Sequence, residues 1–190
     1  MQLVNLLRNG KPERMSKRSG KAIALRDLLD EVSVDAARFF FNHSKPTSPV
    51  DFDLDLAVRE DSDNPVYYVQ YAHARICSLV RKMYEEEGMP VPDAAEVDAS
   101  LLTSPEELAL LKTLARFPED IRLAGRDLDP SQIDRYLISL AGDFHRFYNA
   151  NRIKGETPAL AAARLKLSDT TRAVLQNGLY LIGVSAPEKM

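Results

Sequence analysis

A basic loop near the start of the sequence holds the residues best suited to phosphate chemistry. Residues 14–20 (RMSKRSG) combine three cationic side chains with two serines and a glycine. Lysine supplies a compact positive charge to oxygens that become more negative as pyrophosphate leaves. Ser16 and Ser19 can donate hydrogen bonds to phosphate, and Gly20 lets the backbone approach closely. The pattern favours a flexible clamp on a nucleoside triphosphate; on charge alone, an ordinary solvated surface loop is the stronger alternative.

Aromatic and cationic side chains also recur along the segment 64–87, which we predict to be a helix. Tyr67, Tyr71 and Arg75 are spaced by four residues and therefore lie near one face of it. Tyr68 lies elsewhere around the helix. A tyrosine ring can stack on a base, and arginine can stack or bind phosphate. The alternative is that this face is core, with each hydroxyl bonded to a polar partner.

A second set of such residues lies near the end of another predicted helix. His145, Tyr148 and Arg152 are spaced at i, i+3 and i+7, while Phe144 and Phe147 occupy the neighbouring apolar side. An imidazole, a phenol and a guanidinium together form a plausible platform for single-stranded bases. For His145 alone, a core or capping role is the alternative.

Three acidic residues, Asp51, Asp53 and Asp55, have the alternating spacing that begins a calcium-binding loop. Apolar residues stand between them, and the glycine and terminal bidentate glutamate of such a loop are missing. We interpret the segment as a structural segment or a linker, and we predict no metal site.

Short elements are expected in the first quarter of the chain. Residues 3–7 predict one strand, which ends at the turn dipeptide Asn9-Gly10. Apolar spacing predicts short helices over 25–29 and 34–41.

The rest of the chain is predicted to be helical. Start and stop residues place the expected helices at 64–87, from Ser104 onward with a kink or division at Pro118, at 132–153 with Ser131 as its cap, and at 157–182. Four or five helices of this length form a bundle. The predicted fold class is therefore mainly α, a helix bundle preceded by a short α/β segment.

Composition is typical of a soluble globular protein, with 45% hydrophobic and 28% charged residues among 190. No apolar run approaches the roughly 20 residues that span a bilayer, so we expect no membrane partner. A single cysteine, Cys77, excludes an internal disulfide and suits a reducing compartment. We expect the protein to be cytoplasmic.

Charge is distributed unevenly along the chain. Residues 1–50 hold 9 Lys and Arg against 5 Asp and Glu, residues 51–130 hold 8 against 18, and residues 131–190 hold 8 against 5. The middle would repel a polyanion, whereas both ends could bind one.

Longer strings resemble known proteins. Residues 14–20 resemble the signature loop of class I aminoacyl-tRNA synthetases, with Arg14 in place of the usual first lysine. Consecutive segments look like those of bacterial arginyl-tRNA synthetases: 25–32 (LRDLLDEV), 35–40 (DAARFF), 51–57 (DFDLDLA), 64–76 (NPVYYVQYAHARI), 173–179 (AVLQNGL) and 183–190 (GVSAPEKM). The likeness covers essentially the whole chain and is weaker over 91–129.

The resemblance implies roles for the loop residues. Lys17 occupies the position of the lysine that stabilises the transition state of amino-acid activation by ATP, which makes it the expected catalytic residue. Met15, Ser16, Lys17 and Ser19 are the expected ATP-binding residues. ATP with Mg would be the cofactor of the full-length enzyme, and none is expected in this fragment.

The resemblance also implies a tRNA-binding site. Residues 144–149 (FHRFYN) resemble the family's anticodon motif, and Tyr148 and Met190 match a tyrosine and a C-terminal methionine that help form the floor of the anticodon pocket. We expect Met190 to be tucked into the bundle rather than frayed. Asn151 departs from the small or cysteine residue often found there. The expected partner is tRNA-Arg, bound by Tyr71, Arg75, His145, Tyr148, Arg152 and Met190.

One motif of the family is missing from the sequence. Class I synthetases use a His-x-Gly-His motif near the start of the catalytic fold, and none of His43, His73 and His145 lies in such a context. We therefore expect residues 1–58 to be a catalytic-domain remnant with the signature loop and a stem-contact region, and residues 59–190 to be the anticodon-binding bundle. Such a chain would be inactive alone, monomeric, and a partner of the missing catalytic domain.

Two other interpretations stay open. One is a helical scaffold that binds protein and does not bind RNA. The other is a complete enzyme, which the missing motif disfavours.

Overall fold

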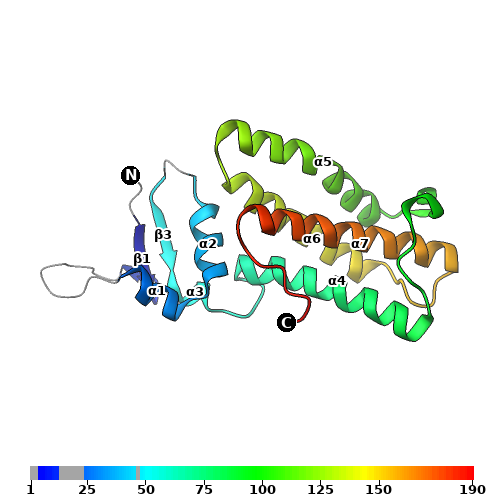
Figure 1. Cartoon of the computed structure of the whole chain (residues 1–190), viewed down its shortest axis with the longest axis horizontal. Helices are drawn as coiled ribbons and strands as arrows, with labels where there is room; N and C mark the ends of the chain where they lie inside the picture. Colours follow the sequence, from blue (N-terminus) through cyan, green and yellow to red (C-terminus); the bar gives the residue numbers. More distant parts are fainter. Residues whose placement is uncertain (1–3, 13–23, 46–47) are drawn as a thin grey trace, which may run out of the picture.

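The computed structural model describes residues 4–12, 24–45 and 48–190. A small unit of short strands and helices leads into an elongated bundle of four long helices (Figure 1). The four expected ATP-binding residues, Met15, Ser16, Lys17 and Ser19, lie outside the described residues.

The small unit is built on a three-stranded sheet of order β2-β1-β3. Strand β1 (Val4–Arg8) turns antiparallel into β2 (Lys11–Pro12), and both turn residues, Asn9 and Gly10, have positive φ (53° and 68°). Positive φ at both central positions is the type I′ turn that matches the twist of a hairpin. Helices α1 (Leu25–Glu31), α2 (Val34–His43) and α3 (Leu54–Ala57) complete the unit.

The third strand corrects the expectation of a single strand. Residues Val50–Asp53 form β3, which runs parallel to β1 with Phe52 opposite Leu6. Phe52 is fully buried and Asp51 is exposed, which is the alternation of a half-buried strand. The same alternation is visible in the sequence, but a parallel strand needs a distant partner, and that partner could not be identified from local spacing.

The acidic residues of this segment each have a structural role. The Asn5 amide donates to Asp51 at 2.9 Å, Asp53 caps α3 by accepting from the Leu56 amide at 3.1 Å, and Asp55 accepts from the Asn9 amide. Among the described residues, no three His, Cys, Asp or Glu side chains gather as a metal site requires.

Four long helices form the bundle: α4 (Pro65–Glu87), α5 (Pro105–Asp127), α6 (Ser131–Ala150) and α7 (Pro158–Leu181). Asn64 caps α4, and Gly88 ends it in the left-handed conformation (φ 61°). Ser104 and Glu107 form the expected capping box of α5. Two 3-10 turns, η2 (Ala94–Glu96) and η3 (Ala99–Leu101), lie in the connection between α4 and α5.

Three predicted helix boundaries differ from the structure. Of the two outcomes expected at Pro118, a kink or a division, the division is wrong, because α5 continues through the proline to Asp127. Pro130 takes the cap position that we expected for Ser131, and the Ser131 hydroxyl bonds Asp129 instead. Helix α6 ends at Ala150, since Asn151 is extended (φ −121°, ψ 119°).

Helix α6 is the centre of the bundle, in contact with α2, α4, α5 and α7. Its fully buried residues Leu137, Leu140, Phe144 and Phe147 form much of the core. None of the described helices is long and apolar enough to cross a membrane.

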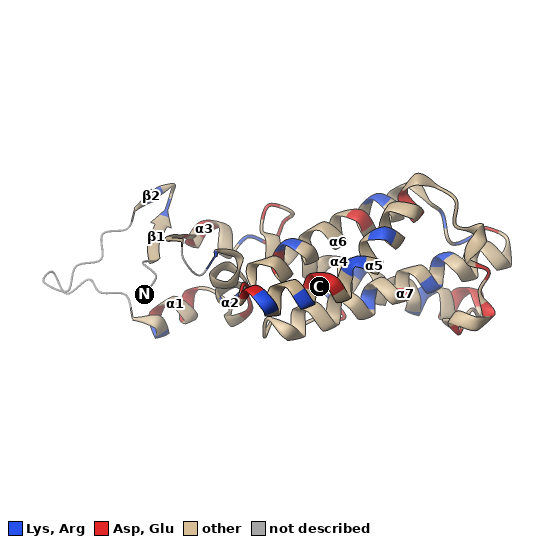
Figure 2. Cartoon of the chain, turned by 90° about the horizontal axis from the view of Figure 1, so that it is seen from above, with Lys and Arg blue, Asp and Glu red and all other residues tan. Residues whose placement is uncertain are grey.

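Acidic residues gather at the end of the bundle far from the small unit (Figure 2). They include Asp93, Glu96 and Asp98 in the connection between α4 and α5. Basic residues are interspersed along the long helices (Figure 2). A polyanion would therefore be repelled by the far end and could be bound along the bundle.

Gly178 allows α7 to pack closely on α6. A Cβ at this position would lie 2.5 Å from Leu137 Cδ2, which is fully buried. We expect Gly178→Ala to lower the free energy of unfolding by roughly 1–3 kcal/mol, because the added methyl overfills the core. Gly125→Ala in α5 is the matched control: its Cβ would meet no atom within 4 Å, so the variant should gain roughly 0.5–1 kcal/mol. Urea denaturation measures both, and equal stabilities would contradict this packing.

A carboxyl group is buried in the first turn of α6. Asp134 has no exposed surface, and neither of its oxygens has a hydrogen-bond partner among the described residues. Burial raises the pKa of Asp134 to about 8. The charge of Arg135 lowers this pKa, and the nearby Asp129 carboxylate raises it slightly. The folded protein therefore holds a proton here that the unfolded chain releases near its ordinary pKa of about 4.

This proton makes stability depend on pH. Because the pKa of Asp134 is higher in the folded state, its contribution is fully present below about pH 4 and is lost as pH rises toward 8. Asp134→Asn cannot ionise. From pH 5 to pH 8 its free energy of unfolding should rise relative to the wild type by about 1 kcal/mol per pH unit. Urea midpoints at the two pH values measure this, and parallel pH profiles would refute it.

Candidate nucleic-acid interface

Aromatic rings from α4 and α6 meet on one side of the bundle. Tyr67 and Tyr71 stack with ring centroids 6.1 Å apart and an interplanar angle of 7°. His145 of α6 lies 6.0 Å from Tyr71 and 4.8 Å from Tyr68. The structure thus brings together residues from two segments about 75 positions apart in the sequence.

A guanidinium joins this group of rings. The Arg75 Cζ atom lies 4.2 Å from the centroid of Tyr148 and 5.8 Å from that of Tyr71. Cations are attracted to ring faces at these distances. Tyr148 also packs on Phe144 at 5.8 Å and is only half-buried, so it is not sealed in the core. Arg75 and Tyr148 therefore hold each other in place at the surface.

These rings border a concave surface that we call the aromatic pocket. Its volume is about 370 Å³, and it is lined by Ser62, Tyr67, Tyr68, Tyr71, Arg75, His145 and Asn149. Pockets of this size are typical of small-ligand sites. Its walls of flat rings and one cation suit a planar, electron-rich group such as a nucleobase.

Tyr68 corrects the sequence-based assignment of helix faces. We expected it to lie away from Tyr67 and Tyr71, yet all three line the aromatic pocket. Helix α6 packs against α4 on this side. The wall of the pocket therefore includes more of the α4 surface than one line of residues at i, i+4 spacing. Tyr68 and Tyr71 are three residues apart, a helical spacing that could have indicated the contact.

The imidazole of His145 is half-buried beside the pocket. Burial lowers its pKa, and the charge of Arg75 lowers it further, against the opposite effect of the Tyr68 backbone. The ring is therefore neutral at pH 7. Its Nε2 atom is buried and has no hydrogen-bond partner within the described part of the chain. A neutral ring of this kind can stack on a base without adding charge.

The C-terminal tail returns to α4 and is held there by an arrangement that we call the tail anchor. The Asp35 carboxylate of α2 accepts from the Ser185 amide at 3.1 Å and from the Ser185 hydroxyl. The Gln70 amide of α4 donates to Asp35 at 2.8 Å and to the Ser185 carbonyl at 3.0 Å. Three segments that are distant in the sequence thus meet at these three residues. The tail itself runs back beside α4 (Figure 1).

Further contacts fix the path of the tail. His73 bonds the Pro187 carbonyl at 2.9 Å, and Asn42 donates to the Ile182 carbonyl at 3.3 Å. Gly183 turns the chain with φ 70°, and a Cβ there would lie 2.7 Å from Arg38 Nη1. Val184 is buried after this turn. The tail is therefore docked rather than frayed.

Met190 ends the docked tail but stays half-exposed, at 53% of its accessible surface. It lines one pocket together with Tyr67 and Gln70 and a second pocket together with Tyr71 and Arg75. The tail is packed on the bundle as expected, whereas the Met190 side chain is not enclosed.

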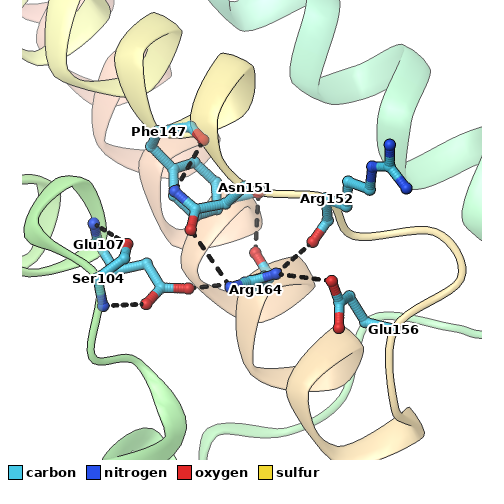
Figure 3. Close-up of polar contacts among 8 residues, drawn as sticks. Ser104, Glu107, Phe147, Asn151, Arg152, Glu156 and Arg164 are labelled. Carbon is cyan, nitrogen blue, oxygen red and sulfur yellow. Dashed lines mark hydrogen bonds and ion pairs between the residues drawn. The ribbon is translucent and has the colours of Figure 1, made fainter.

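Arg152 lies apart from His145 and Tyr148. It follows the end of α6 in an extended segment, so the i+7 helical spacing does not apply to it. Its side chain is exposed and points away from its own backbone carbonyl, which accepts from Arg164 Nη1 at 2.6 Å (Figure 3). The structure thus groups Tyr71, Arg75, His145 and Tyr148, with Met190 nearby.

A buried ion pair holds the end of α6 in place (Figure 3). Arg164 of α7 donates to Glu107 of α5 at 2.6 Å and to Asn151 at 3.2 Å. Asn151, the departure noted in the sequence, donates in turn to the Phe147 carbonyl at 3.1 Å. Burial alone would raise the pKa of Glu107, but the Ser104 amide and Arg164 together hold that pKa below its usual range. The pair therefore stays charged and joins three helices.

Known proteins resemble this chain over its whole length. The sequence profile described as the DALR anticodon binding domain matches residues 69–190. The chain is 54% identical over 189 residues to an arginine–tRNA ligase of Acetivibrio thermocellus and 52% identical over 190 residues to one of Caldanaerobacter subterraneus. All of the chain is covered in both matches. It spans about a third of the length of these relatives, 33% and 34%.

Solved structures share the fold. A Campylobacter jejuni protein described as an arginyl-tRNA synthetase superposes with a TM-score of 0.86 at 32% identity, covering 100% of this chain and 40% of that one. The Thermus thermophilus arginyl-tRNA synthetase superposes with a TM-score of 0.79 at 27% identity, covering 99% of this chain and 34% of that one.

The Glu107–Arg164 pair yields a stability prediction. Arg164→Met leaves Glu107 buried without its partner, so we expect the free energy of unfolding to fall by roughly 3–5 kcal/mol. Arg122→Met is the matched control, because the Arg122–Glu119 pair of α5 is exposed on both sides, so that water already screens it and its loss should change stability little. Thermal or urea unfolding measures both, and equal losses would contradict a buried role for Arg164.

Proposed function

The chain belongs to the DALR anticodon-binding domain family, and from this premise we propose that its bundle binds tRNA-Arg through the anticodon. The aromatic pocket carries this proposal. It offers several ring faces and one cation to an unstacked base, and the anticodon loop is where tRNA presents unstacked bases. Tyr148 supports the pocket by packing against Arg75.

The proposed contacts divide by chemistry. Tyr71, Tyr148 and His145 offer ring faces for stacking, and Arg75 can stack or bind phosphate. Met190 contributes a soft apolar contact from the tail, where it lines the neighbouring pocket with Tyr71 and Arg75. Arg152 is exposed at the end of α6, where it would contact backbone phosphate rather than a base.

We further propose that the chain works as part of an arginine–tRNA ligase. The relatives that it matches carry that name, and the chain spans about a third of their length. In the whole protein, Lys17 would stabilise the transition state of arginine activation, and Met15, Ser16, Lys17 and Ser19 would bind ATP, which Mg accompanies. Residues 1–58 would then belong to the catalytic part and residues 59–190 to tRNA recognition. The chain alone would be monomeric and would not aminoacylate.

A protein-binding scaffold is the second candidate function. A largely apolar pocket of about 410 Å³ lies between the connection 91–103, α5 and α7, with Leu102, Leu111 and Leu114 among its walls. A partner could bind there without any RNA. This function predicts that the chain binds no tRNA.

Anticodon recognition is tested by filter binding of tRNA-Arg and of the same tRNA with a swapped anticodon. The wild type should prefer tRNA-Arg, and Tyr148→Ala should weaken that binding by roughly 5- to 100-fold, because it removes the ring that holds Arg75 in the wall of the aromatic pocket. Tyr84→Ala is the matched control: this tyrosine is exposed near the end of α4 and lines none of the pockets described above. Equal affinity of the wild type for both tRNAs would refute the proposal.

A further inference from the structure

A second concave surface, which we call the cationic pocket, adjoins the aromatic pocket. Its volume is about 380 Å³. Helix α4 and the C-terminal tail line it, with Tyr71, Ala74, Arg75, Ser78 and Arg81 from the helix and Glu188, Lys189 and Met190 from the tail. The α4 residues are spaced by three or four positions or adjoin one another, so they form one continuous stripe.

Positive charge dominates the cationic pocket. Arg75, Arg81 and Lys189 line it together with one acidic side chain, Glu188, and the terminal carboxylate of Met190 adds a second negative charge. Within the described part of the chain, none of these three cations forms an ion pair, whereas Arg59, Arg122 and Arg126 are each paired with carboxylates. Several unpaired cations around one hollow attract an anion and are stabilised when it binds.

Hydrogen-bond donors in the cationic pocket are already oriented. Arg81 Nη2 donates to the Ser78 hydroxyl at 3.4 Å, which holds the guanidinium beside that hydroxyl. The Ser78 hydroxyl keeps its own proton to donate. Arg75 is held by the rings of Tyr71 and Tyr148. A fork of N–H groups next to a hydroxyl matches the oxygens of a phosphate.

The two pockets share a wall. Tyr71 and Arg75 line both the aromatic and the cationic pocket. An RNA strand carries one phosphate for every base, joined through the sugar. A strand whose base enters the aromatic pocket therefore carries a phosphate toward the neighbouring cationic one.

We propose that the cationic pocket binds a backbone phosphate of the same RNA strand whose base occupies the aromatic pocket, through Arg75, Ser78, Arg81 and Lys189. This inference rests on the proposed function, because the strand is taken to be the anticodon loop. Phosphate contacts carry no sequence information, so the cationic pocket supplies affinity and register while the aromatic pocket supplies specificity. Lys189 reaches the site because the tail anchor holds the C-terminal residues against α4.

Charge-changing variants of the 190-residue chain test the site. Arg81→Gln should weaken tRNA-Arg binding about tenfold at low salt and reduce the slope of log affinity against log salt concentration by roughly 0.7. The loss should be equal for the anticodon-swapped tRNA. Lys82→Gln is the matched control, since it removes the same charge from the next residue of α4, which is exposed and outside the pocket. Glu188→Gln should strengthen binding.

A second arm identifies the phosphate. Anticodon stem-loop RNAs carry a neutral methylphosphonate at one loop position at a time. The wild type should lose affinity at the position whose phosphate occupies the cationic pocket, and Arg81→Gln should show no further loss there. The proposal would be overturned if, at every loop position, the loss caused by Arg81→Gln added to the loss caused by the methylphosphonate. It would also be overturned if Arg81→Gln left the slope of log affinity against log salt concentration unchanged.

The two proposals can fail separately. If Tyr148→Ala removes the preference for the arginine anticodon while Arg81→Gln behaves like Lys82→Gln, the phosphate site is refuted and anticodon recognition stands. If the wild type shows no anticodon preference but Arg81→Gln still loses affinity and salt slope, the phosphate site stands and anticodon recognition is refuted.

Discussion

The Asp35 carboxylate joins three parts of the chain that are far apart in the sequence. It accepts hydrogen bonds from Ser185 in the tail and from Gln70 in α4, while it belongs itself to α2. Hydrogen bonds to an ionised acceptor are about twice as strong as neutral ones. Because chain ends otherwise fray, this tail anchor is what allows Lys189 and Met190 to line pockets on α4. Without it, the bundle would keep its rings and lose one wall of its binding surface.

Rigid helices carry the rest of that surface. Arg75 is held between the rings of Tyr71 and Tyr148, so little side-chain freedom remains to be lost when RNA binds. The Glu107–Arg164–Asn151 contacts hold the end of α6 against α5 and α7. They lie outside both pockets and act by keeping α6, with His145 and Tyr148, in register with α4.

Two neighbouring pockets of different chemistry divide the proposed recognition into two tasks. Flat rings hold a base of any identity by stacking, and the polar groups among them, such as the tyrosine hydroxyls and the Asn149 amide, can bond its edge. Unpaired cations attract phosphate of any sequence. The wall shared by Tyr71 and Arg75 couples the tasks, because a strand positioned by its phosphate presents its base at a defined place.

Local sequence signals were sufficient to predict the long helices and to identify many residues of the candidate site. Asn64, Gly88 and the Ser104–Glu107 pair predicted the ends of α4 and the start of α5, since capping depends on residues within one turn. Helical spacing also put Tyr71 and Arg75 on one face. The resemblance of the strings to arginyl-tRNA synthetases agreed with the matched family and relatives.

Which of these faces meet depends on how the helices pack together. Tyr68 joined the aromatic pocket because α6 packs beside it, and Arg152 left the predicted face because α6 ends at Ala150. The parallel pairing of β3 with β1 and the docking of the tail join residues that are 46 and 150 positions apart. The spacing of residues along one segment predicts the direction in which each side chain leaves the axis of its own helix or strand. The distance between two axes is set by packing across the whole core, which no local pattern records.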